Sequence, residues 1–313
     1  MTLILVKCEN LPTSASNEES GTTSSTASTG TTGTSGTGST GSAGTTSSST
    51  VDKITSLAAS SGHGYVKLTW VNPSSNFSGV TILRKTGSYS TSNTDGTQVY
   101  MAAGTNYVDN GLTNGTTYYY SAYAYNSLNY YAEAVQVSKS PAAFSLASSA
   151  SDNGFNHTAT IPAEFKDSFG AQCTGSNNFP KITWQNAPSG TVEFVLIVED
   201  ATSGNWVHLN LFGINSTRTE IPRVTGSGNQ PNLSAYGSVG ENSWAGTAFG
   251  NTHTSGYAGP CPPNGTGVHN YYFKIYAMNS HVTSMNKVNR STFDTNYAAG
   301  IIASAEIYGT SSF

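Results

Sequence analysis

The alternation of apolar and polar residues predicts short β-strands along most of the chain beyond residue 50. Val66, Leu68 and Trp70 alternate with polar residues, so their side chains share one face of a strand. Residues 194–200, FVLIVED, contain instead a continuous apolar run, which is typical of a strand that is covered on both faces. Residues 271–278, YYFKIYAM, are rich in aromatic residues, which predicts a further buried strand. The pattern therefore indicates a mainly all-β protein.

The residue composition divides the chain into a tail and two folded regions. Residues 20–50 are serine, threonine and glycine apart from two alanines, and such a segment has no large apolar side chains with which to build a core. A chain of 313 residues holds about two domains. We therefore expect a disordered tail or linker over residues 1–50, one domain over residues 51–141 and a second domain over residues 142–313.

The first domain has the strand and turn spacing of an immunoglobulin-like β-sandwich. Its residues 70–73, WVNP, and 112–118, LTNGTTY, resemble segments of a fibronectin type III domain. The resemblance implies that Tyr118 forms the corner that fixes a strand crossing. We interpret the domain as a spacer for its neighbour, because such a fold does not by itself imply a function. A sugar-binding patch built from exposed tyrosines is the alternative.

Two segments of the second domain combine a strand with a nearby histidine. In the first, Asp200 ends the apolar strand and residues 206–208, WVH, follow; the second is residues 259–271, GPCPPNGTGVHNY. In this order, the segments resemble the two signatures of the phosphatidylethanolamine-binding protein family in its bacterial form. The similarity covers roughly residues 145–313, a domain-sized length, and implies a mostly antiparallel β-sandwich with few short helices. The clearest helix signal of the chain lies around residues 290–298.

The resemblance assigns roles to individual residues of a ligand pocket. It implies a polar floor of Asp200, His208 and His269, with further contributions from Gly259, Pro262, Pro263 and Tyr271. Protonated imidazoles bind phosphate or carboxylate oxygens, and a nearby carboxylate holds the rings in position and raises their pKa. In the family this pocket takes small anions and phospholipid head groups. The expected partner is a small anionic or phosphorylated ligand, with a phospholipid head group among the candidates, or a protein that docks on the pocket rim.

The three cysteines carry separate predictions. Cys173 and Cys261 resemble residues of loops that line the family's pocket, and we predict that they form a disulfide; two free thiols are the alternative. Cys8 follows the short apolar run of residues 3–6. We interpret this start as the end of a lipoprotein signal with Cys8 as the lipidated residue, and a plain disordered start is the alternative. The expected localisation is extracytoplasmic, in a periplasm or at a cell surface, with membrane contact only through such an anchor.

Composition and charge argue against two broad classes of function. Only 10% of the residues are charged, whereas the average soluble domain has about 25%, and the profile fits exported bacterial β-rich proteins. The net charge of −4 and the lack of any lysine and arginine cluster argue against binding to nucleic acid. No apolar run approaches the roughly 18 residues that are needed to span a bilayer.

Three hypotheses about function remain open at this point. The leading one is a non-catalytic binding protein that needs no cofactor and no metal. The second is a hydrolase, in which Cys261 is the nucleophile and His269 its base, or in which Asp200, His208 and His269 ligate zinc. The third is a structural surface protein whose pocket is a relict. A disulfide at Cys261 would exclude the first form of the hydrolase, and failure to bind any phosphate or phospholipid analogue would favour the third hypothesis.

Overall fold

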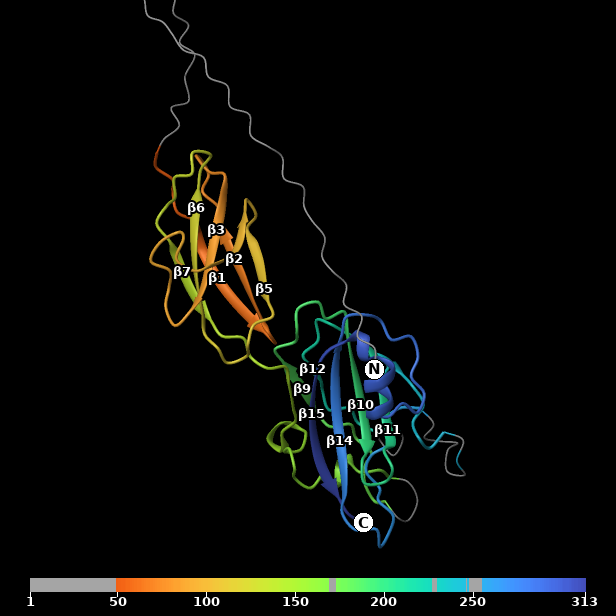
Figure 1. Cartoon of the computed structure of the whole chain (residues 1–313). Coiled ribbons are helices and arrows are strands. Elements are labelled where there is room, and N and C mark those ends of the chain that lie inside the picture. The colour runs from red at the N-terminus through yellow and green to blue at the C-terminus, as the bar shows by residue number, and fades with distance from the viewer. Residues whose placement is uncertain (1–48, 169–172, 227–229, 246, 248–254) are drawn as a thin grey trace, which may run out of the picture. The chain divides into compact units, whose positions relative to one another are not determined.

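The computed structural model describes residues 49–168, 173–226, 230–245, 247 and 255–313 (Figure 1). β-Strands dominate these residues, and the helical elements among them are short. The predicted all-β class is therefore confirmed. None of the helices described is both long and apolar enough to cross a membrane. The predicted tail lies outside the described residues except for residues 49 and 50, and Cys8 lies outside them as well.

Two antiparallel sheets form the N-terminal sandwich (Figure 1). One has the strand order β1-β2-β5 and the other the order β4-β3-β6-β7. The strands are β1 (Thr55–Gly62), β2 (Tyr65–Val71), β3 (Gly79–Thr86), β4 (Thr97–Ala102), β5 (Asn106–Asn110), β6 (Tyr118–Tyr125) and β7 (Val135–Lys139). This pairing of a three-stranded with a four-stranded sheet is that of a fibronectin type III domain, so the predicted fold of this domain is confirmed.

Alternating residues fill the core of this sandwich, as the sequence pattern predicts. Val66, Leu68 and Trp70 on β2 are at most 4% exposed and belong to one core cluster with residues of β3 and β6. The hydroxyl of Tyr118 accepts a hydrogen bond from the backbone N–H of Thr113 at 3.0 Å. This bond is the predicted tyrosine corner, and it ties the start of β6 to the loop that precedes it.

A five-stranded sheet with the order β13-β11-β10-β14-β15 forms the centre of the C-terminal domain, beside a three-stranded sheet with the order β12-β9-β8. The strands are β8 (Ser145–Ala147), β9 (Ile182–Gln185), β10 (Glu193–Asp200), β11 (Trp206–Asn215), β12 (Glu220–Ile221), β13 (Ser238–Val239), β14 (His269–Met278) and β15 (Ile301–Ser311). The helical elements are the 3₁₀ turns η1 (Ala150–Asp152), η2 (Ala163–Phe165) and η4 (Ala298–Gly300) and the helix α1 (Arg290–Asn296). The hydrophobic clusters of this domain share no residue with that of the first. The domain boundary at residues 141 and 142 stays a prediction.

The central strand β10 is buried along its whole length, as its continuous apolar run predicts. Leu196 and Val198 belong to the large core cluster on one face of the sheet, and Val195 and Ile197 belong to the cluster on the other face. Burial on both faces explains why this strand has no alternation of apolar and polar residues. Side chains alternate along a strand, so the last two residues of β10, Glu199 and Asp200, lie on opposite faces of the sheet.

Helix α1 covers the second of these faces at the predicted position. It begins at Arg290 because the side chain of Asn289 accepts a hydrogen bond from the backbone N–H of Thr292 at 2.8 Å, which caps the first turn. Phe293 is its buried residue, and its ring packs against that of Tyr276 on β14 with 4.5 Å between the ring centroids. This contact anchors the helix on the face of the sheet that contains Val195 and Ile197.

Candidate functional site

The ends of two neighbouring strands bring Asp200 and His269 into contact. Asp200 is the last residue of β10, and His269 is the first residue of β14. The Asp200 Oδ2 and His269 Nδ1 atoms are 2.6 Å apart, and both side chains are about 95% buried. The other oxygen, Oδ1, accepts hydrogen bonds from the backbone N–H groups of Thr202 and Ser203 at 2.9 and 3.2 Å. The turn after β10 therefore fixes the carboxylate and leaves one oxygen for the imidazole.

The hydrogen-bond chain continues through the imidazole to Thr266. The His269 Nε2 atom lies 2.8 Å from the Thr266 hydroxyl, which lies in turn 2.7 Å from the carbonyl oxygen of Pro263. A hydroxyl has one proton, and a carbonyl can only accept. All contacts are satisfied together when the imidazole carries both protons, donates to Asp200 and Thr266, and the Thr266 hydroxyl donates to Pro263. The chain then ends in an ion pair between Asp200 and His269.

The second predicted histidine, His208, lies in a different environment. Its Nδ1–H donates to the carbonyl oxygen of Ala258 at 2.6 Å, and its ring makes edge contacts with Trp244 and Tyr271 at centroid distances of 4.7 and 5.1 Å. Burial lowers the pKa of His208 to about 4, and the hydrogen bond to Ala258 and the charge of Asp200 only partly oppose this. Asp200 raises the pKa of His208, as expected, but burial outweighs this effect and makes the net shift downward.

Tyr271 completes the group around the carboxylate. It is 1% exposed and lies directly opposite Asp200 in the pairing of β10 with β14. Burial, followed by the charge of Asp200, raises the pKa of the Tyr271 hydroxyl, so this group keeps its proton and serves as a donor. The structure thus brings together the predicted residues Asp200, His208, His269 and Tyr271.

The loop before β14 is held against the rest of the domain at several points. Cys173 and Cys261 form a disulfide with 5.8 Å between their Cα atoms. The backbone N–H of Gly259 donates to the Asn177 side chain at 2.8 Å, and a Cβ atom at Gly259 would overlap the carbonyl oxygen of Phe165. Only glycine fits this close approach of two backbone segments.

The two predicted prolines of the loop behave differently from each other. Pro262 is buried, whereas Pro263 is exposed and takes part through its carbonyl group, which accepts the hydrogen bond from Thr266. Gly265 and Gly267 flank Thr266 with φ angles of 83° and 86°, a region that favours glycine. The two glycines therefore shape the turn that presents the Thr266 hydroxyl to His269.

The disulfide decides one of the open alternatives. The sulfur of Cys261 is bonded to Cys173 and is not free to act as a nucleophile, so the hydrolase with Cys261 and His269 is wrong. The zinc alternative also lacks its geometry, since the described residues contain no group of three or more histidine, cysteine or acidic side chains placed to hold a metal. Both ring nitrogens of His269 and the Nδ1 atom of His208 are engaged in hydrogen bonds, to Asp200, Thr266 and Ala258 respectively.

Two residues at this site had no role in the sequence analysis. Trp244 contacts the ring of His208, and it comes from a segment without a recognisable strand or helix pattern. Thr266 was hidden among the glycines of residues 259–271. The spacing of Thr266 three residues before His269, between two glycines, is the signal that could have identified it.

Comparison with known proteins places this domain in a family. The model of the family described as "Phosphatidylethanolamine-binding protein" matches residues 151–312. The chain belongs to this family. A UPF0098 protein of Aquifex aeolicus is 31% identical to it over 145 residues, which are 44% of this chain and 75% of the relative. "Putative lipoprotein LppC" of Mycobacterium tuberculosis is 34% identical over 125 residues, 39% of this chain and 51% of the relative.

A solved structure is also similar to the phosphatidylethanolamine-binding domain. The crystal structure of Escherichia coli YbcL, described as a new member of the mammalian PEBP family, is 25% identical and covers 54% of this chain and 98% of its own, with a TM-score of 0.43. Family membership, which rests on the family model and the relatives, supports a ligand-binding role for the domain.

Proposed function

We propose that the C-terminal domain binds a small anionic or phosphorylated ligand, such as a phospholipid head group presents, without altering it chemically. The observation that carries this proposal is the continuous chain from Asp200 through His269 to Thr266. In this chain, one side of the His269 ring pairs with the buried Asp200 carboxylate. The Nε2–H group on the other side lies next to Thr266, which is exposed. An N–H of this kind is a strong donor to phosphate or carboxylate oxygens.

The Thr266 hydroxyl marks the position that a ligand oxygen would take. In the free protein it accepts the hydrogen bond from His269 Nε2 at 2.8 Å. An anionic oxygen in the same place would give the imidazolium N–H a charged acceptor instead of a neutral hydroxyl, which makes the bond stronger. Binding therefore replaces an internal acceptor by a better one, and Thr266 competes with the ligand.

His208 contributes shape and polarity to the proposed site rather than charge. Its low pKa keeps the ring neutral at pH 7. The charged donor of the proposed site is instead His269, whose contacts with Asp200 and Thr266 fit an imidazole that carries both protons. With one imidazolium beside the Asp200 carboxylate, the site supports a ligand that needs a single charged donor. This favours a monoanionic oxygen group over a cluster of phosphates.

A non-catalytic role is supported by the state of the possible nucleophiles. Cys261 is in a disulfide, and the Thr266 hydroxyl donates its proton to Pro263 rather than to His269. A base that activates a hydroxyl must accept its proton, and His269 does the reverse in the hydrogen-bond chain. Chemical attack by either residue is therefore not part of the proposal.

The remaining parts of the proposal concern placement of the protein in the cell. We propose an extracytoplasmic protein in which the serine-, threonine- and glycine-rich segment and the fibronectin type III domain space the binding domain from an anchor at Cys8. The name of the Mycobacterium tuberculosis relative supports a lipid anchor. Lipid labelling of Cys8, with Cys8→Ala as the control, would test this placement separately from ligand binding.

A titration of the full chain tests the binding site. Phosphate, phosphoethanolamine and a short-chain phosphatidylethanolamine are added in turn and followed by calorimetry and phosphorus NMR. The proposal expects saturable binding that is lost in His269→Ala and kept in His157→Ala, a matched change of an exposed histidine. Flat titrations of the unmodified protein would contradict the proposal and favour a structural protein with a relict pocket. Equal losses of binding in His269→Ala and His157→Ala would place the ligand elsewhere.

A further inference from the structure

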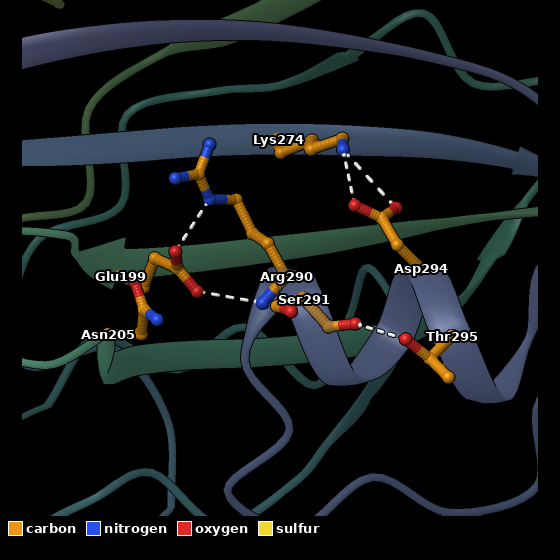
Figure 2. Close-up of a pocket in the computed structure, with 7 residues that line it drawn as sticks. All are labelled: Glu199, Asn205, Lys274, Arg290, Ser291, Asp294 and Thr295. Atoms are coloured by element: carbon orange, nitrogen blue, oxygen red, sulfur yellow. Dashed lines mark hydrogen bonds and ion pairs between the residues drawn. The ribbon is translucent and has the colours of Figure 1, made fainter.

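A pocket lies beside α1, on the face of the central sheet opposite to the site around His269 (Figure 2). It has a volume of about 390 Å³, within the roughly 300–1,000 Å³ of small-ligand sites. Its lining consists of charged, amide and hydroxyl side chains, which are Glu199, Asn205, Lys274, Arg290, Ser291, Asp294 and Thr295. No residue of the family's predicted site belongs to this lining. The pocket is therefore separate from the site around His269.

The charged groups of this pocket neutralise one another. Glu199 is 1% exposed and accepts from the Arg290 backbone N–H and from its Nε–H, both at 2.7 Å (Figure 2). Lys274 Nζ lies 3.2 and 3.0 Å from the two carboxylate oxygens of Asp294 (Figure 2). Arg290 also donates through Nη1 to Glu306 at 2.8 Å. A ligand with a large net charge would have to compete with these pairs.

Lys274 and Arg290 nevertheless have N–H groups that their ion pairs do not use. An ammonium group has three N–H bonds and a guanidinium has five. The contacts of Lys274 with polar groups in the described part of the chain go to Asp294, and those of Arg290 side-chain atoms occupy Nε–H and one N–H of Nη1. The Arg290 guanidinium lies 4.0 Å over the Tyr272 ring, and Lys274 Nζ lies 4.8 Å from the centroid of the Tyr276 ring. These rings hold the donors in place.

We propose that this pocket binds a monosaccharide or disaccharide. Each sugar hydroxyl is both a donor and an acceptor, so neighbouring hydroxyls can meet a spare N–H and a carboxylate oxygen without separating the ion pairs. The Asn205 amide and the Ser291 hydroxyl add groups of the same dual kind, and the Thr295 hydroxyl, which donates to the Ser291 carbonyl oxygen at 3.0 Å, adds an acceptor (Figure 2). Binding of a charged ligand would require the separation of a partly buried ion pair, which costs free energy. Binding of a neutral polyhydroxylated ligand would leave the ion pairs intact.

An NMR titration of the full chain with cellobiose, maltose and N,N′-diacetylchitobiose tests the proposal. We expect saturable shifts of the backbone amides of Asn205 and Ser291 and of the Arg290 Nε–H with at least one of the sugars, at millimolar concentrations. Signals of His269 should not move, because its side chain lies on the other face of the sheet. Absence of saturable shifts with all three sugars would overturn the proposal.

Two variants and a matched control locate the binding. Arg290→Lys keeps the charge but loses the planar donor set, and Asp294→Asn changes a half-exposed acceptor without removing a buried charge. Each should weaken sugar binding at least fivefold. The control is Arg218→Lys, an arginine that also lies over a tyrosine ring but outside the pocket, and it should bind as the unmodified protein does. Unchanged affinity in both pocket variants would overturn the assignment to this pocket.

Discussion

Glu199 and Asp200 are neighbours at the end of β10, and they direct their carboxylates to opposite faces of the same sheet. Asp200 pairs with His269, whereas Glu199 pairs with Arg290. Both carboxylates are at most 4% exposed, and each has a cation from a different segment of the chain as its partner. Two polar sites therefore rest on one strand end, separated by the thickness of the sheet.

Removal of the Asp200 carboxylate should destabilise the C-terminal domain and abolish anion binding. In Asp200→Ala, the N–H groups of Thr202 and Ser203 and the His269 imidazole lose their acceptor. Breaking a buried ion pair by removal of one partner costs about 3–5 kcal/mol. Urea unfolding should show a loss of this size, and Asp200→Asn should lose less, because its amide oxygen can still accept from the turn. A loss below about 1 kcal/mol in Asp200→Ala would contradict the ion pair, since that is the range of exposed pairs.

Stability should fall in acid because of His208. The unfolded histidine binds a proton at its usual pKa of about 6.5, whereas the folded one does so only near 4. Full stability is therefore present above pH 6.5 and is lost as the pH falls towards 4, by on the order of 3 kcal/mol. Urea unfolding at a series of pH values measures this loss.

The matched variants for the acid effect are His208→Gln and His157→Gln. The first removes the buried titrating group, so its unfolding free energy should fall less between pH 6.5 and 4 than that of the unmodified protein. The second changes an exposed histidine and should keep the full slope. Equal slopes in all three proteins would show that the folded pKa of His208 is not lowered.

The strands were predictable because their patterns have direct physical causes. Val66, Leu68 and Trp70 alternate because one face of β2 is buried, and the apolar run of β10 is continuous because both of its faces are covered. The role of Tyr118 followed from resemblance, and its bond to Thr113 has the expected form. These features depend on neighbours that are close in sequence or on a regular period.

The electrostatics of the site could not be predicted in the same way. The pKa of His208 depends on its burial against Trp244 and Tyr271, which come from distant segments. The pairing of Glu199 with Arg290 spans 91 positions of sequence, and neither residue has a local signal. The residue types identified the candidate site residues, but the packing of the fold determines which of these side chains can carry a charge.

Reduction of the disulfide should destabilise the domain and loosen the loop before β14. Cys173 and Cys261 are 88 positions apart, and closing a loop of this length contributes up to about 5 kcal/mol in the chain-entropy estimate, with about 2–4 kcal/mol typical. Thermal unfolding with and without reductant should reveal a lower midpoint in the reduced protein. The double variant Cys173→Ala/Cys261→Ala should have the same lower midpoint, and the reductant should not change it. If the variant instead unfolded at the midpoint of the oxidised protein, the stabilising role of the disulfide would be contradicted.

Thr266 should limit the affinity of the anion site in the free protein. Thr266→Val keeps the branched shape but removes the hydroxyl that accepts from His269 and donates to Pro263. The internal hydrogen bond is worth about 0.5–1.5 kcal/mol, so phosphate should bind roughly two- to tenfold more tightly to the variant. Calorimetry measures the change, and Thr266→Ser, which retains the hydroxyl, should bind as the unmodified protein does.

The opposite result for Thr266 would be equally informative about the geometry. Weaker binding in Thr266→Val than in Thr266→Ser would mean that the hydroxyl contacts the ligand instead of competing with it. Because Thr266 is exposed, the methyl group that replaces its hydroxyl faces solvent and makes no clash with the core. The variants therefore separate an internal competitor from a ligand contact at the same imidazole nitrogen.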